Sequence, residues 1–154
     1  MMSLWTGFTW LVSAVGIVPL LHSASQALRW ERDSLAQGQA VLLAQDLAQR
    51  LHLNAAVATQ YRLDWGQQPI SPACRDRPCS RVDWAQADLS QWRTHVAQTL
   101  PDADVWLQGS GAGAVNPWLV LAWPSESAND TRTASRLPVP CPERKRCQAW
   151  VLTP

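Results

Sequence analysis

The fold is decided by the stretch GFTWLVSAVGIVPLL, residues 7–21, which is predominantly apolar and carries no charge. No Asp, Glu, Lys or Arg occurs from Met1 to Leu28. Residues 4–21 alone would form a helix roughly 27 Å long, close to the thickness of a bilayer's hydrocarbon core. The stretch is therefore either a membrane segment or an export signal.

The same helix is expected to continue beyond this stretch with a single apolar face. Apolar residues recur at i, i+4, i+7, i+11 and i+15, the spacing of one side of an α-helix, at Ala36, Ala40, Leu43, Leu47 and Leu51. Asp46 and Arg50 stand at the i, i+4 spacing of an intrahelical ion pair, and Asn54 is placed to end the helix. The sequence thus predicts one N-terminal helix up to about residue 53.

The rest of the chain predicts a second helix and a small sheet. The second helix is expected to begin near Asp83, with Gln86 at capping-box spacing, and to stop before Pro101. Short runs between turn-forming residues predict strands at residues 61–65, 104–108, 118–123 and 148–152. The expected fold class is α+β: a long N-terminal helix with a membrane-spanning first half, packed on a small antiparallel sheet, with an extra helix in the connecting region.

Length, charge and aromatic content bound the class of protein. With roughly 25 membrane residues removed, the 154-residue chain leaves one domain with a modest core. A formal net charge of +1 gives no electrostatic reason to propose nucleic acid or another charged surface as the main partner. Of the 10 tryptophans, Trp5 and Trp10 are expected at the membrane interface. Most of the others are expected in the core, with about one in four displayed for binding.

The cysteines indicate an oxidising compartment. They occur as two close pairs beyond the apolar stretch, Cys74 with Cys79 and Cys141 with Cys147. An even number in a small exported domain predicts two disulfides, and we favour the local pairing among the three connectivities because each pair encloses a turn-like polar run. Zinc is the rival ligand, but these spacings differ from those of zinc knuckles and the intervening Arg and Lys would repel a cation.

This order of elements, with Gly7-Phe8-Thr9 at the start of the apolar helix, resembles the prepilins of type IV pili and the related pseudopilins of type II secretion. Within them it is most similar to the minor pilins of the PilV type. LLAQDLAQRLHLN, residues 42–54, matches the family's helix end A-x-D-M/L-A-x-R-x-x-x-N. DLSQW, residues 88–92, followed by Leu100-Pro101, matches its D-L-x-x-W … L-P helix.

The resemblance implies a processing site and a domain organisation. A prepilin peptidase would cut between Gly7 and Phe8, and the new amine of Phe8 would be methylated. Residues 1–7 would be a short leader, and residues 8–28 the transmembrane half of the helix, which later enters the filament core. Residues 29–154 would form a periplasmic or extracellular pilin-like domain. A helix that is apolar all round supports this, because lipid and a bundle of like helices solvate it equally well.

The partners implied by the resemblance are the prepilin peptidase, the inner membrane before assembly, and other pilin subunits through the N-terminal helix. It implies a single-pass inner-membrane location followed by the pilus, with no cofactor and no metal. Val12 is a departure, because the family normally has Glu as this fifth residue after cleavage. That buried carboxylate is thought to meet the terminal amine of a neighbouring subunit. The tip pseudopilin of type II secretion also lacks it, so Val12 indicates a subunit at or near a filament tip.

Other functions stay open from the sequence. They are a pseudopilin-like secretion subunit, a DNA-uptake minor pilin, a membrane-anchored periplasmic binding domain, and a soluble protein exported by cleavage after Ala27. DNA would be bound through the basic positions Arg75, Arg77, Arg81 and Arg144-Lys145-Arg146. An enzyme is not expected, because no nucleophile elbow or zinc-protease motif occurs and the histidines lie in or beside predicted helices.

Overall fold

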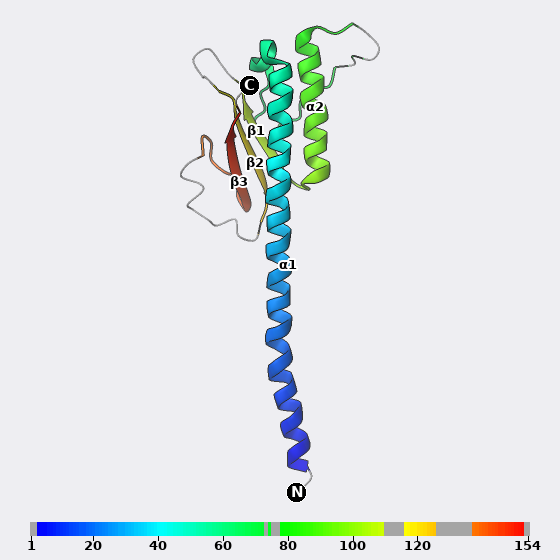
Figure 1. Cartoon of the computed structure of the whole chain (residues 1–154), viewed down its shortest axis with the longest axis vertical. Coiled ribbons are helices and arrows are strands. Elements are labelled where there is room, and N and C mark those ends of the chain that lie inside the picture. The colour runs from blue at the N-terminus through cyan, green and yellow to red at the C-terminus, as the bar shows by residue number, and fades with distance from the viewer. Residues whose placement is uncertain (1–2, 73, 75–77, 110–115, 126–136, 153–154) are drawn as a thin grey trace. The chain divides into compact units, whose positions relative to one another are not determined.

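The computed structural model describes residues 3–72, 74, 78–109, 116–125 and 137–152, and the side chains of these from Ser25 onward. In chain order its elements are α1 (Ser3–Leu53), the 3₁₀ helix η1 (Ala55–Gln60), α2 (Arg81–Thr99), β1 (Asp104–Gln108), β2 (Trp118–Pro124) and β3 (Lys145–Val151) (Figure 1). The chain divides into two compact units, residues 1–35 and 36–154. The protein is α+β, with a helix packed on a small antiparallel sheet, as the sequence predicts.

The first unit consists of the N-terminal part of α1. Where the structure describes side chains, no helix carries a stretch long and apolar enough to cross a membrane. Residues 8–24 of the predicted membrane segment lie outside that part of the chain, as do the side chains at Gly7, Phe8 and Val12. The membrane segment and the processing site therefore stay predictions.

The second unit is built on a three-stranded antiparallel sheet in the order β1-β2-β3. The central strand, β2, is buried at every position from Leu119 to Trp123, because packed side chains cover both of its faces. Its predicted bounds differ from the observed strand by one residue, Pro124, and β1 has the predicted bounds. An uninterrupted apolar run is what burial on two faces requires, whereas a half-exposed strand would alternate.

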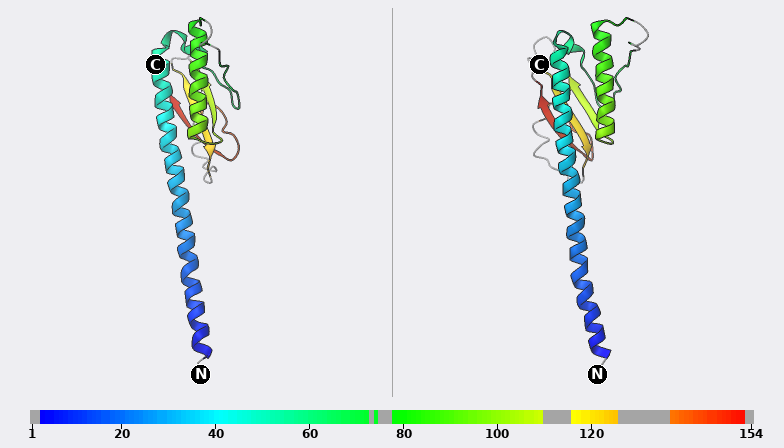
Figure 2. Two further views of the ribbon diagram at one scale, coloured as in Figure 1. Left: turned by 90° about the vertical axis from the view of Figure 1, so that its right-hand side faces the viewer. Right: turned by 45° about the vertical axis from the view of Figure 1, so that its right-hand side comes forward.

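One face of the sheet shares the main hydrophobic core with two helices. In α1 the contribution comes from residues 36–53, where Leu43, Leu47 and Leu51 are buried as the helical spacing predicts. From α2 come Leu89 and the fully buried Trp92, among others. Figures 1 and 2 show α2 lying alongside this part of α1. The core is therefore common to α1, α2 and the sheet.

The opposite face of the sheet carries a smaller second core. In register across the strands, Trp106, Val120 and Ala149 form one row of this face. Ala122 and Cys147 of the sheet belong to the same core, and Trp65 and the segment before β3, with Leu137, Val139 and Cys141, pack against it. The sheet is consequently covered on both sides, and β2 is not exposed to solvent on either.

Helix ends were predicted well in position and less well in mechanism. Asn54 follows the last residue of α1, but its φ of −113° is not left-handed; its backbone N–H instead donates to the Arg50 carbonyl at 3.0 Å. The second helix begins two residues before Asp83, and Ser80 is its N-cap. Ser80 and Asp83 form a reciprocal capping box, so the predicted pairing of Asp83 with Gln86 was wrong.

Two predicted strands differ from the structure. Residues 61–65 form no strand; only Leu63 pairs, in an isolated bridge with Leu107. The last strand begins at Lys145 instead of residue 148, because the chain between Cys141 and Cys147 turns within a few residues. Arg144 completes that turn with a φ of 59°, and the strand starts at the next residue.

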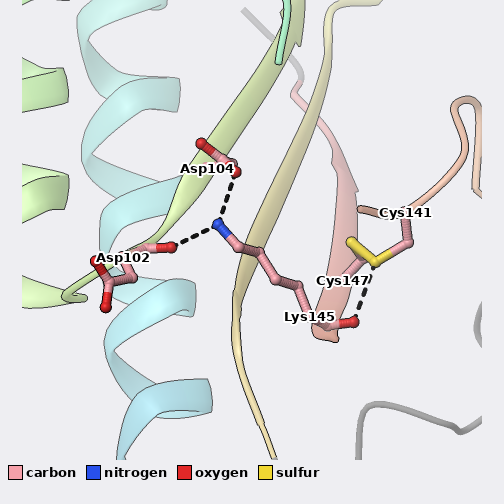
Figure 3. The surroundings of a disulfide bond; sticks show 5 residues. All are labelled: Asp102, Asp104, Cys141, Lys145 and Cys147. Carbon is pink, nitrogen blue, oxygen red and sulfur yellow. Dashed lines mark hydrogen bonds and ion pairs between the residues drawn. A yellow bond between two sulfur atoms is a disulfide. The ribbon is translucent and has the colours of Figure 1, made fainter. Parts of the chain in front are cut away.

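Lys145 and a disulfide fix the start of β3. The structure pairs Cys141 with Cys147 and Cys74 with Cys79, at Cα–Cα distances of 5.9 and 5.4 Å. From β3, the Nζ of Lys145 reaches across β2 and donates to Asp104 Oδ2 at 2.6 Å and to the Asp102 carbonyl at 2.7 Å (Figure 3). The Cys141 Sγ lies 3.3 Å from the Lys145 carbonyl oxygen; a disulfide sulfur has no proton, so this is a contact and not a hydrogen bond. The two outer strands are thereby tied across the central one.

Gly109, directly after β1, provides a test of how closely the sheet approaches η1. A Cβ at this position would stand 2.7 Å from the Ala58 carbonyl oxygen and 3.0 Å from that of Tyr61. Because backbone oxygens cannot swing aside, Gly109→Ala should lower the free energy of unfolding by about 1–3 kcal/mol. A Cβ at Gly38, in α1, would meet nothing within 4 Å. Gly38→Ala should therefore raise the free energy of unfolding by roughly 0.5–1 kcal/mol, because alanine favours the helix more than glycine does. Urea unfolding of both variants measures this, and equal effects would contradict the close approach.

Candidate functional site

The two sequence motifs that resemble pilin motifs meet in the structure. One lies at the end of α1 and contributes Asp46, Arg50 and Asn54, and the other lies on α2 and contributes Asp88 and Trp92. The polar side chains of both motifs form one hydrogen-bonded cluster with Tyr61, which follows η1. We call these residues the helix clamp: Asp46, Arg50, Asn54, Tyr61 and Asp88.

Arg50 is the centre of the helix clamp. Its Nε donates to the two carboxylate oxygens of Asp46 at 3.0 and 3.1 Å, within the same helix. Its Nη1 donates to Oδ1 of Asp88 on α2. The three side chains are only partly exposed, between 22% and 33%, so water screens these ion pairs less than it would on an open surface. One guanidinium thus holds a carboxylate of its own helix and joins α1 to α2 through the carboxylate of Asp88.

Tyr61 closes the cluster on its other side. Its hydroxyl donates to the second carboxylate oxygen of Asp88 at 2.8 Å and accepts from the Asn54 amide at 3.0 Å. The Asn54 amide also donates to the Arg50 carbonyl at 3.2 Å, so the asparagine that ends α1 is held by the same network. Every named member of the clamp therefore has a polar partner within it.

Burial and charge set the ionisation of the clamp. Burial raises the pKa of the Tyr61 phenol far above its ordinary value, and its hydrogen bond to Asp88 raises the pKa further. Burial alone would lower the pKa of the Arg50 guanidinium, but the hydrogen bonds and charges of Asp46 and Asp88 outweigh it, and the pKa is raised. The phenol therefore stays neutral and the guanidinium stays charged at all ordinary pH values.

A second, buried contact reinforces the same pair of helices. The indole Nε1 of Trp92 donates to the Leu43 carbonyl at 3.1 Å. Trp92 is fully buried, so its N–H would lose a hydrogen bond without this partner. The contact lies further along the antiparallel pair than the Arg50–Asp88 bridge, and together they fix the register of α2 on α1.

The chemistry of the clamp is that of a structural tie. Its carboxylates, phenol and guanidinium satisfy one another, and no cysteine, serine or histidine takes part. Among the described residues no group of three or more His, Cys, Asp or Glu is placed to hold a metal ion. A shallow hollow lined by Ala48, Gln49, His52 and Leu53 lies on the surface of α1 alone. Neither feature offers a nucleophile with an adjacent base.

The predicted basic positions are not gathered into a site by the described residues. Arg75 and Arg77 lie outside them. Lys145 is held by Asp104 and the Asp102 carbonyl, so its ammonium is already paired. Arg81 and Arg144 are exposed, the first at the start of α2 and the second in the turn before β3.

In comparisons with known proteins, no family model, no curated protein and no solved structure matches the chain. The predicted ion pair between Asp46 and Arg50 within α1 is confirmed. The sequence did not predict that this pair also meets Asp88 of the second motif. It missed Tyr61, which was expected in a strand. The only feature that sets Tyr61 apart in the sequence is that it is the single tyrosine of the chain. The residues around it do not indicate that its phenol pairs with a distant carboxylate.

Because the chain has only one tyrosine, phenolate absorbance reports Tyr61 alone. In the folded protein this titration should lie well above the ordinary pKa of 10.0, and in denaturant it should return to it. The folded state keeps the proton to a higher pH than the unfolded state. The stability that the protonated Tyr61 contributes is therefore complete below pH 10, and it is lost as the pH rises through the raised pKa of the folded state.

The matched variant for this titration is Tyr61→Phe. At neutral pH the free energy of unfolding of this variant should be about 1 kcal/mol lower than that of the wild type. Above pH 10 the variant should lose less stability than the wild type, because it has no phenol to titrate. Urea unfolding at a series of pH values measures both effects. A Tyr61 that titrates in the folded protein as it does in denaturant would contradict the clamp geometry.

Replacing Arg50 tests the ion pairs directly. Arg50→Met would leave the carboxylates of Asp46 and Asp88 partly buried without their cation, at an expected cost of about 2 kcal/mol. Arg62→Met, at an exposed position, should change the free energy of unfolding by less than about 0.5 kcal/mol. Denaturant unfolding of both variants gives the comparison, and an equally small loss for Arg50→Met would mean that the clamp adds no stability.

Proposed function

We propose that the protein is a minor-pilin-like structural subunit of a type IV pilus that takes part in pilus assembly, at or near the filament tip. The observation that carries the proposal is the helix clamp. The resemblance rests on two motifs far apart in the sequence. Their polar residues belong to one hydrogen-bonded network, namely Asp46, Arg50, Asn54 and Asp88. The bonds from Asp88 to Arg50 and Tyr61 bring the second motif onto the first, and this contact between the two motifs supports the resemblance.

A filament subunit needs this kind of tie. Its helix is held by neighbouring subunits while its domain is displayed, so any pull on the filament acts on the junction between helix and domain. In this protein residues 36–53 of α1 are part of the domain core, and Arg50 and Trp92 bond them to α2. Separating that helix from the domain would break ion pairs and expose apolar surface together.

The other features fit the same role. Two local disulfides suit an oxidising periplasm or cell exterior. An uncharged N-terminal run suits storage in the inner membrane and later packing against like helices, after processing by a prepilin peptidase. With Val12 in place of the family's Glu, the subunit would lack the carboxylate that docks on the amine of a neighbour, which is tolerable where one neighbour is absent, as at a tip.

Among the alternatives, DNA uptake receives the least support. Lys145, the only lysine of the chain, is bonded to Asp104 across the sheet, and freeing it for phosphate would leave that carboxylate without its partner. A pseudopilin-like subunit of a secretion system and a membrane-anchored periplasmic binding domain share the fold and the disulfides. The mature N-terminus distinguishes the anchored domain from both filament subunits.

Mass spectrometry of the mature N-terminus tests the proposal. A chain that begins at Phe8 with a methylated amine is expected in membrane and pilus fractions. Gly7→Glu should leave the leader attached, because a bulky charge would replace the small residue before the cut. A mature chain that begins at Met1 or Leu28 would reject processing as a pilin.

Val12→Glu tests the tip assignment. The substitution restores the carboxylate that the family uses for docking, so the variant should enter pili as well as the wild type or in more copies. Quantitative immunoblotting of purified pili measures incorporation. Loss of pilus assembly in this variant would contradict the idea that Val12 marks a subunit that does not need the charge.

A further inference from the structure

Helix α2 keeps its charges off its outer side. It has four charged residues, Arg81, Asp83, Asp88 and Arg93. The first two lie in its first turn, where Asp83 forms the capping box with Ser80. Asp88 belongs to the helix clamp, and the buried Arg93 donates to the Ala103 carbonyl at 3.0 Å. Beyond the first turn, every Asp and Arg of α2 is therefore used inside the domain.

What remains on the other side is a long uncharged surface. Positions three and four apart place these residues on one side of the helix, opposite Leu89, Trp92 and Val96. We call them the α2 outer face: Trp84, Ala87, Gln91, Thr94, His95 and Gln98. All are exposed except Ala87, which is half-buried. Figure 2 (left) shows the molecule from the α2 side, and no described element is drawn in front of this helix.

The composition of the α2 outer face is unusual for a surface that meets only water. The outer side of a solvated helix normally carries Lys, Glu, Asp or Arg. Here it carries amides, a hydroxyl already bonded to the Ser90 carbonyl, the imidazole of His95, which is neutral in the formal charge at pH 7, and the indole of Trp84, which is 56% exposed. Depletion of charge together with an exposed tryptophan is the composition found at the centre of protein interfaces.

We propose that the α2 outer face is a docking surface for an uncharged surface of a neighbouring protein subunit. Charge decides the class of partner. A nucleic acid or an anionic membrane would have to shed water from its phosphates without meeting an Arg or Lys on this face. An uncharged protein surface has no such cost, and its amide and hydroxyl groups can exchange hydrogen bonds with Gln91 and Gln98 while Trp84 enters an apolar recess.

The size of the face indicates how it is used. With 19 residues, α2 is roughly 28 Å long, and one side of a single helix offers less than the ~800 Å² per partner of a standard interface. The face is thus expected to act as one contact among several in an assembly, and not to hold a free-standing pair of chains. That the neighbour is another filament subunit rests on the proposed function.

Photocrosslinking in cells that produce the full chain tests the proposal. A photoreactive phenylalanine at Gln91 or Gln98 should give a discrete adduct with another subunit of the filament, and the same group at the exposed Gln67 should not. Trp84→Ala should lower the yield from Gln91 by about tenfold, since an exposed tryptophan at an interface is a typical hot spot. Val151→Ala, which removes an exposed apolar side chain from β3, is the matched control and should leave the yield unchanged.

The outcomes separate this proposal from the proposed function. An unchanged Tyr61 titration in Trp84→Ala shows that the variant is folded, so a lost adduct reports docking. An adduct with a protein that is no filament subunit contradicts both the pilus role and the neighbour proposed for this face. No adduct from a chain that begins at Phe8 and is present in pili overturns the docking surface alone. An adduct with nucleic acid, or only with a second copy of this chain, also overturns it.

Discussion

The second unit depends on one guanidinium that holds two carboxylates from two helices. Arg50 is bonded to Asp46 within α1 and to Asp88 on α2, and the phenol of Tyr61 occupies the remaining oxygen of Asp88. Two carboxylates this close would repel each other without the cation between them. The arrangement is therefore stable only as a whole, and it specifies which turn of α2 lies against which turn of α1. Apolar packing alone would specify that register much less sharply.

The sheet is held by an analogous device on its other face. β2 is buried on both sides and offers no polar side chain, so the outer strands are tied across it by Lys145 of β3 and Asp104 of β1. The disulfide between Cys141 and Cys147 restricts the turn from which Lys145 projects. A small domain with a modest core gains from such ties, because each one limits the freedom of the unfolded chain or removes a way for the strands to slip.

How far the sequence predicts this structure follows from the range of each interaction. Helix spacing placed Leu43, Leu47 and Leu51 in the core, and apolar runs placed β1 and β2 almost to the residue, because these signals are local. The start of β3 was misjudged because a disulfide and a left-handed Arg144 form a turn that composition does not show. Within the clamp, the local ion pair between Asp46 and Arg50 was predicted from helix spacing. The contact from Arg50 to Asp88 was not, since two residues this far apart along the chain share no periodic signal.

The clamp also has a consequence for the surface of α2. Asp88 and Arg93 are drawn inward, the first by Arg50 and Tyr61 and the second by the Ala103 carbonyl. Because this carboxylate and guanidinium are bonded inside the domain, the outer side of α2 would carry a charge only if it had further charged residues. Between Trp84 and Thr99 none has been added. An exposed tryptophan beside uncharged amides is consistent with a face that another protein covers. The inward ties and the outward docking surface are thus two results of the same distribution of charge on one helix.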